Sequence, residues 1–141
     1  MKILFVCTGN TCRSPMAEAI LKAKNIPGVE VQSTGIFAGE APMSEHAAAV
    51  LTSEGISSEH TSRPLEDDFI SWSSLVLTMT DAHKERLVVD YPEAAEKIFT
   101  LKEFAEEEDG DVQDPYGGDL PTYQQTYREL DELIAKVIDK L

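Results

Sequence analysis

The chain has 141 residues and a formal net charge of −14, because 26 acidic side chains stand against 12 basic ones. This length predicts one domain over residues 1–141, and the acidic charge argues against nucleic acids and anionic membranes as partners. The first apolar run ends after Val6, too early for a signal-peptide core or a membrane span, so we expect a cytoplasmic protein.

Apolar runs and helical periodicity alternate along the chain. Strands are predicted at Lys2–Val6, Val29–Ser33, Leu75–Met79 and Lys97–Leu101. Helices are predicted at Pro15–Lys24, Glu45–Glu54, Ala82–Val89 after an Asp81 cap, and Pro121–Lys140, with a further short helix at Glu66–Trp72. This alternation predicts an α/β fold, a doubly wound three-layer sandwich with a four-stranded parallel sheet of the flavodoxin-like type.

The segment between the first strand and the first helix is the most informative part of the sequence. Ser14 is a good N-cap and Pro15 suits the first helical position, so a helix should begin there. The backbone N–H groups before it and the helix N-terminus would converge on one point and bind an anion. The predicted phosphate-binding residues are Thr8, Gly9, Asn10, Thr11, Cys12 and Arg13.

Cys7 and Arg13 lie at the two ends of this segment. A helix N-terminus and a nearby cation both stabilise a thiolate, the reactive form of cysteine. The guanidinium of Arg13 offers a planar fork for two phosphoryl oxygens. The Cys-x5-Arg spacing alone is weak evidence, expected by chance about 0.06 times in such a chain. The alternative is a Cys7 buried at a strand end and an Arg13 on the surface.

A leaving group needs a proton, and Asp114 is the candidate general acid. It begins the segment Asp114–Gly118, where a proline and two glycines indicate a loop. Loops at the carboxyl edge of a parallel sheet are where such sheets bind ligands. The alternative is an Asx turn with no catalytic part.

Three motifs together resemble the low-molecular-weight protein tyrosine phosphatase family, and more narrowly its bacterial protein-arginine phosphatase branch. They are Val6–Pro15, Ser33–Gly35 and Asp114–Gly118, and the resemblance covers essentially the whole chain. It implies that Cys7 is the nucleophile of a phosphocysteine pathway, Arg13 the phosphate clamp and Asp114 the general acid. Asn10 and Ser14 would support the loop. Phosphorylated proteins would be the substrates, and no cofactor would be needed.

The resemblance also implies specificity residues. Tyrosine-specific relatives typically carry Ile where this chain has Thr11, and the arginine-directed branch is similar to this chain in having Thr. The alternative is that the Thr11 hydroxyl only caps its own loop. Phe37 and Tyr116 would form opposite sides of the pocket rim, although Phe37 could equally be a core aromatic. A tyrosine phosphatase of the same family remains the main alternative.

Cys12 lies in the same loop as Cys7 and is well placed to trap an oxidised Cys7 in a reversible disulfide. The alternative is a packed small residue. An arsenate reductase would need further redox cysteines outside this loop, and the chain has none. A non-enzymatic phosphate-binding or phosphocysteine carrier module would need no general acid.

The remaining polar features support simpler interpretations. The three histidines, His46, His60 and His83, lack metal-ligand spacing with the cysteines and are expected on helix surfaces or loops. The stretch from Phe104 to Asp111 is predicted to be a solvated loop. It contains the acidic residues Glu106, Glu107, Glu108, Asp109 and Asp111. No exposed apolar stripe stands out, which favours a monomer.

Overall fold

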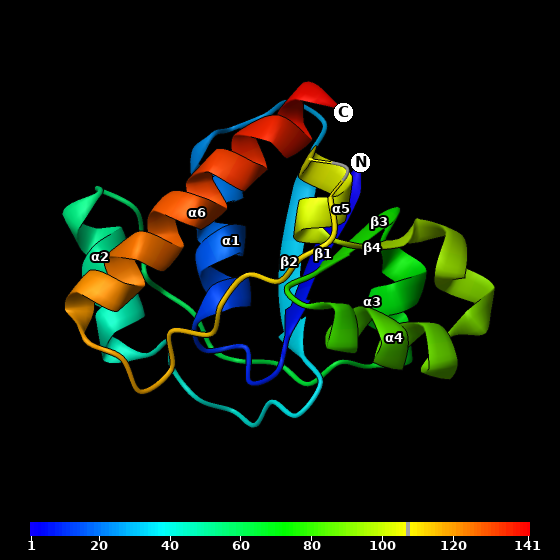
Figure 1. The fold of residues 1–141 in the computed structure, drawn as a ribbon, viewed down its shortest axis with the longest axis horizontal. Helices are drawn as coiled ribbons and strands as arrows, with labels where there is room; N and C mark the ends of the chain where they lie inside the picture. The colour runs from blue at the N-terminus through cyan, green and yellow to red at the C-terminus, as the bar shows by residue number, and fades with distance from the viewer. Residues whose placement is uncertain (107) are drawn as a thin grey trace.

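A computed structural model describes residues 1–106 and 108–141 as a four-stranded parallel sheet covered by helices on both faces (Figure 1). The strands are β1 (Lys2–Cys7), β2 (Glu30–Gly35), β3 (Leu75–Thr78) and β4 (Ile98–Thr100). Their order in the sheet is β2-β1-β3-β4, and β1 lies at the centre between two parallel neighbours. The predicted doubly wound fold is therefore confirmed.

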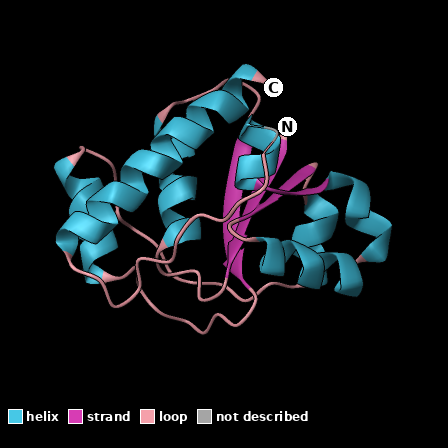
Figure 2. Cartoon of the chain, in the orientation of Figure 1, coloured by secondary structure: helices cyan, strands magenta, loops and turns pink. Residues whose placement is uncertain are grey.

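The helices form the outer two layers of the sandwich (Figure 2). They are α1 (Arg13–Ala23), α2 (Glu45–Ser53), α3 (Asp67–Trp72), α4 (Asp81–Asp90), the 3₁₀ helix η1 (Pro92–Lys97), α5 (Leu101–Glu106) and α6 (Leu120–Asp139). Alternate side chains of β1 pack against the helices on opposite faces of the sheet, as expected for a strand buried on both faces. Ile3 and Phe5 pack with α1, α2, α5 and α6, whereas Leu4 and Val6 pack with α3, α4 and η1.

Two predicted helix caps are wrong. Helix α1 begins at Arg13 with Cys12 at its N-cap, so Ser14 lies inside the helix. Its hydroxyl is occupied by tertiary contacts with Cys7 and Asn10, which outweigh its local preference for a cap. Similarly, Thr80 rather than Asp81 caps α4, because the Thr80 hydroxyl accepts a hydrogen bond from the His83 amide.

The acidic stretch from Phe104 to Asp111 is predicted to be a solvated loop, but its first residues, up to Glu106, belong to helix α5. Phe104 belongs to α5 and packs against the core, and Ala105 beside it is only 4% exposed. Burial of these two side chains stabilises a short helix that the surrounding charges do not reveal. The prediction for Glu107 concerns a residue that lies outside those described.

Candidate active site

The loop after β1 lies at the carboxyl edge of the sheet, and the buried side chain of its own residue Asn10 fixes its shape through hydrogen bonds. Asn10 is fully buried and adopts a left-handed backbone conformation with φ of 56°. Its side-chain Nδ2 donates to Ser14 Oγ at 2.8 Å and to Ser33 Oγ at 3.0 Å, and its Oδ1 accepts from the Arg63 amide at 2.9 Å. One side chain thus ties the loop to α1, to β2 and to the segment before α3.

The end of β2 packs directly beneath this loop. A Cβ atom at Gly35 would lie 2.6 Å from the Thr8 carbonyl oxygen and 2.8 Å from the Asn10 nitrogen. Both contacts are with backbone, so a larger residue would push the loop out of place. This close approach gives the Ser33–Gly35 motif a physical role, in which Ser33 supplies a hydrogen bond and Gly35 supplies space.

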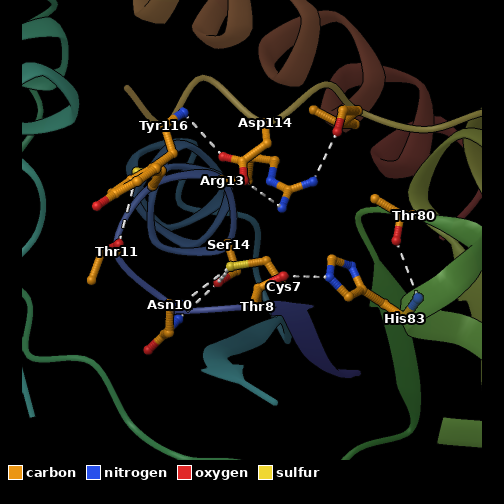
Figure 3. Close-up of polar contacts among 12 residues, drawn as sticks. Cys7, Thr8, Asn10, Thr11, Arg13, Ser14, Thr80, His83, Asp114 and Tyr116 are labelled. Atoms are coloured by element: carbon orange, nitrogen blue, oxygen red, sulfur yellow. Dashed lines mark hydrogen bonds and ion pairs between the residues drawn. The ribbon is translucent and has the colours of Figure 1, made fainter. Parts of the chain in front are cut away.

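The thiol of Cys7 is at the base of the loop and is 3% exposed. Its sulfur accepts a hydrogen bond from the Asn10 amide at 3.3 Å and lies 2.8 Å from Ser14 Oγ (Figure 3). The Ser14 oxygen already accepts from Asn10, and the Thr34 carbonyl is more distant from it, at 3.4 Å. Either atom of the Cys7–Ser14 pair can donate, but a Cys7 thiolate can only accept, so the Ser14 hydroxyl is positioned to stabilise that form.

Arg13 and Asp114 face each other across the mouth of the loop (Figure 3). Arg13 is 5% exposed and donates through Nη1 to the Val112 carbonyl at 3.0 Å, while its Nη2 lies 3.5 Å from Asp114 Oδ2. The Asp114 side chain is 51% exposed, and its Oδ1 accepts from the Tyr116 amide at 3.1 Å. Asp114 therefore forms the Asx turn that was the alternative to a catalytic role, and its carboxyl group also faces the loop.

These residues enclose a pocket of about 230 Å³. Its lining consists of Cys7, Thr8, Gly9, Thr11, Cys12, Arg13, Asp114 and Tyr116. A larger cavity of about 550 Å³ lies beside α1, and neither cysteine lines it. The smaller pocket is the one with a nucleophile, a cation and an acid facing a common space, so it is the one equipped for phosphoryl chemistry.

The predicted specificity residues are not equally placed. Thr11 and Tyr116 line the pocket, and the Tyr116 side chain is 78% exposed at its rim. Phe37 is absent from the lining and is 71% exposed, so the core alternative for it is wrong. Its ring lies 5.6 Å from the guanidinium carbon of Arg86 on α4. The role of Phe37 at the pocket rim therefore stays a prediction.

Cys12 reaches the same pocket from the start of α1. Both cysteines are free thiols and both are buried. The Cys12 sulfur donates to Ser44 Oγ at 3.4 Å and lies 3.5 Å from the Tyr123 hydroxyl, whose pKa is raised to about 12 by burial and by that contact. The packed-residue interpretation is thus compatible with the structure, and the redox role stays a prediction.

Two histidines contact the loop. His60 lies in a loop, as predicted, whereas His83 lies on α4 but is buried rather than on the helix surface. His83 on α4 is 8% exposed, and its Nε2 lies 2.9 Å from Thr8 Oγ1. Burial, and then the charge of Arg13, lower its pKa to about 4. His60 is half-buried, donates through Nε2 to the Asn10 carbonyl at 2.8 Å, and has a pKa lowered by burial. Both contacts join residues 50 or more positions apart, so no local sequence signal marks them.

Within residues 1–106 and 108–141, no group of three or more histidine, cysteine or acidic side chains is arranged to hold a metal ion. Among the same residues, no helix is both long and apolar enough to cross a membrane.

Comparison with known proteins places this site in context. Residues 2–141 match the model of the family described as low molecular weight phosphotyrosine protein phosphatase. The chain is 50% identical to a protein-arginine-phosphatase of Geobacillus stearothermophilus, over 99% of this chain and 95% of that protein. It is 42% identical to the low molecular weight protein-tyrosine-phosphatase PtpB of Staphylococcus aureus, over 99% and 98%.

A solved structure extends the comparison to three dimensions. The structure of the YwlE arginine phosphatase, a C7S mutant with a phosphorylated active-site serine, superposes with a TM-score of 0.97. The two chains are 41% identical over 100% of this chain and 95% of the other.

Proposed function

Because the chain belongs to the low-molecular-weight phosphotyrosine protein phosphatase family, we propose that it hydrolyses phosphoarginine residues in proteins through a phosphocysteine intermediate. The observation that carries the proposal is the pocket in which Cys7, Arg13 and Asp114 meet, with Thr11 in its wall. Phosphorylated proteins in the cytoplasm are the proposed substrates, and the proposed active form is a monomer.

In the first step, the Cys7 thiolate attacks phosphorus and the phosphorus–nitrogen bond breaks. Arg13 and the loop N–H groups hold the phosphoryl oxygens, whose charge grows in the transition state. Protonated Asp114 gives its proton to the leaving guanidine nitrogen. The 3.5 Å separation between Arg13 Nη2 and Asp114 Oδ2 supports this role, because a phosphoryl group held by Arg13 would lie next to the acid.

In the second step, water attacks the phosphocysteine, and the Asp114 carboxylate takes its proton. The products are inorganic phosphate and the Cys7 thiolate, which recovers its hydrogen bonds from Ser14 and the Asn10 amide. Every group that moves a proton or binds charge in this cycle belongs to the chain itself.

Thr11 is proposed to set the preference for phosphoarginine. A β-branched side chain is stiff, so exchanging the Thr hydroxyl for the extra carbon atoms of Ile changes the pocket wall without moving the loop. An added methylene would press on the slender guanidinium stem, whereas a hydroxyl leaves space and can bind the attacking water. One methylene contributes about 1–3 kcal/mol of discrimination, equivalent to roughly 10- to 200-fold in kcat/KM.

The decisive experiment compares kcat/KM for one protein carrying phosphoarginine and a matched protein carrying phosphotyrosine, with Cys7→Ser as the blank. We expect phosphoarginine to be preferred, and the preference to fall in Thr11→Ile by roughly 10-fold or more. A wild-type preference for phosphotyrosine would overturn the substrate proposal while leaving the roles of Cys7, Arg13 and Asp114 untouched.

Tyrosine phosphatase activity is the second candidate. Its support is Tyr116, which is exposed at the pocket rim, where its ring could stack on a phenol. The relative from Staphylococcus aureus is named a tyrosine phosphatase. Arsenate reduction has less support, because both cysteines lie in one loop. A phosphocysteine carrier would show unchanged behaviour in Asp114→Ala, which separates it from both enzymes.

A further inference from the structure

The side chain of Thr8 makes a contact that the reaction cycle above does not use. Thr8 lines the pocket beside Cys7, and its hydroxyl oxygen lies 2.9 Å from His83 Nε2 (Figure 3). His83 comes from α4, which packs on the other face of the sheet from α1. A buried imidazole on a separate element thus contacts a hydroxyl at the edge of the phosphoryl-binding space.

The hydrogen-bond arrangement around His83 indicates its tautomer. Nδ1 of His83 is buried and has no hydrogen-bond partner among the described residues. A neutral imidazole carries one proton, and a buried unpaired N–H group is rarer in folded proteins than an unpaired acceptor. The proton therefore resides on Nε2, where it has a partner. In this tautomer Nε2 donates and Thr8 Oγ1 accepts.

The direction of this bond decides what the Thr8 hydroxyl can do. A hydroxyl has one proton and two lone pairs. If its oxygen accepts from His83, its own proton is free to turn into the pocket, where a phosphoryl oxygen is the natural acceptor. We infer that His83 is a positioning residue that orients the Thr8 hydroxyl as a side-chain donor to the phosphoryl group. This inference rests on the proposed phosphatase activity but not on the preference for phosphoarginine.

The charges around His83 are consistent with a neutral donor. Arg13 on α1 faces the imidazole and disfavours a second positive charge, whereas Asp111 and Asp114 on the segment before α6 favour one. Thr80 at the start of α4 accepts from the His83 amide and fixes the backbone that carries the ring. On the other side of Thr8, its carbonyl accepts from the Phe37 amide at 2.9 Å. Thr8 is thus held through both its side-chain hydroxyl and its backbone carbonyl.

The test is a double-mutant cycle between Thr8→Val, which removes the hydroxyl at nearly constant shape, and His83→Leu. The measured quantities are kcat/KM for an aryl phosphate and the inhibition constant of inorganic phosphate. Each single variant should lose roughly 10- to 100-fold in kcat/KM and weaken phosphate binding, because a hydrogen bond to a charged oxygen is lost. The double variant should be no worse than either single one, because the two residues act as a unit.

The matched controls separate positioning from stability. His83→Gln places an amide donor near the position of Nε2 and should recover most of the activity, as should Thr8→Ser. Glu85→Gln on the exposed face of α4 should retain wild-type kinetics. Thermal unfolding of each variant identifies any loss that follows from misfolding, and Thr8→Val tests the inference with His83 intact.

Additive losses in the double variant, or normal kinetics and phosphate binding in Thr8→Val, would overturn the inference. A different result would contradict the proposed function: wild-type protein that binds phosphate but hydrolyses no phosphorylated substrate.

Discussion

The two sides of the pocket are built very differently. On the phosphate side, Cys7, Asn10, Arg13 and Ser14 are each at most 5% exposed, and side-chain hydrogen bonds link Cys7, Asn10 and Ser14 to one another. On the leaving-group side, the Asp114 side chain is 51% exposed and Tyr116 is 78% exposed.

The chemistry explains this contrast. A phosphoryl group is the same in every substrate, and a rigid array of donors that fits its transition state lowers the barrier most. The group that leaves differs between substrates and must enter and depart, which favours an open rim with few contacts. Changes on the buried side should therefore damage activity or stability for all substrates, while changes on the open side should alter catalysis without unfolding the chain.

The largest effect is expected for Cys7→Ser, at the centre of the buried side. A serine hydroxyl is a much weaker nucleophile at neutral pH and a poorer leaving group from phosphorus, so kcat should fall by at least about 10⁴-fold. Thermal unfolding should change little, because the smaller atom retains the hydrogen-bond partners of the sulfur. Cys12→Ser is the matched control and should keep measurable turnover. Turnover by Cys7→Ser near the wild-type rate would remove the nucleophile assignment.

The next largest effect is expected for Asp114→Asn, on the open side. Loss of the general acid should slow kcat by about 10²–10⁴-fold, with the greatest loss for substrates whose leaving group most needs a proton. The exposed Asp109→Asn carries the same charge change and should be silent. Steady-state rates on a series of aryl phosphates of increasing leaving-group basicity measure the effect. Equal losses across the series would argue against proton transfer.

Asn10→Ala tests how strongly the buried side depends on one residue. It removes three hydrogen bonds and leaves the Ser14, Ser33 and Arg63 groups without that partner, so the free energy of unfolding should fall by about 2–4 kcal/mol. Asn25→Ala is a close control, because Asn25 also has a positive φ, of 49°, but is exposed and makes only one long side-chain hydrogen bond, to the Ala23 carbonyl at 3.4 Å. Urea unfolding of both variants separates backbone strain from lost hydrogen bonds. Equal losses in the two would show that strain alone matters.

The sequence predicts what is local in this site and misses what is not. Cys7 and Arg13 are predicted because one short loop between a strand and a helix carries both of them. Asp114 requires the further argument that loops at one sheet edge converge. The contacts of Gly35 and His83 with Thr8 arise only when β2 and α4 pack beside β1, so no spacing along the chain reveals them. The Ser14 cap fails for the same reason, since a tertiary partner outweighs a local preference.

The smallest predicted effect is the pH dependence of stability that His83 imposes on the buried side. Its pKa is about 4 in the folded chain and near 6.5 when unfolded, so between these values the unfolded state binds more protons. Stability from this residue is complete above about pH 6.5 and is lost as the pH falls, by about 1–2 kcal/mol from pH 7 to pH 5. The glutamine side chain of the His83→Gln variant cannot titrate, so the free energy of unfolding of this variant, measured by urea at each pH, should vary less over this range than that of the wild type.

His60 has a pKa lowered in the same direction, so His60→Gln should remove a separate part of the dependence of unfolding free energy on pH. A slope unchanged by His83→Gln would mean that the imidazole is solvated in the folded chain, and the tight contact between α4 and the loop would then not exist in solution.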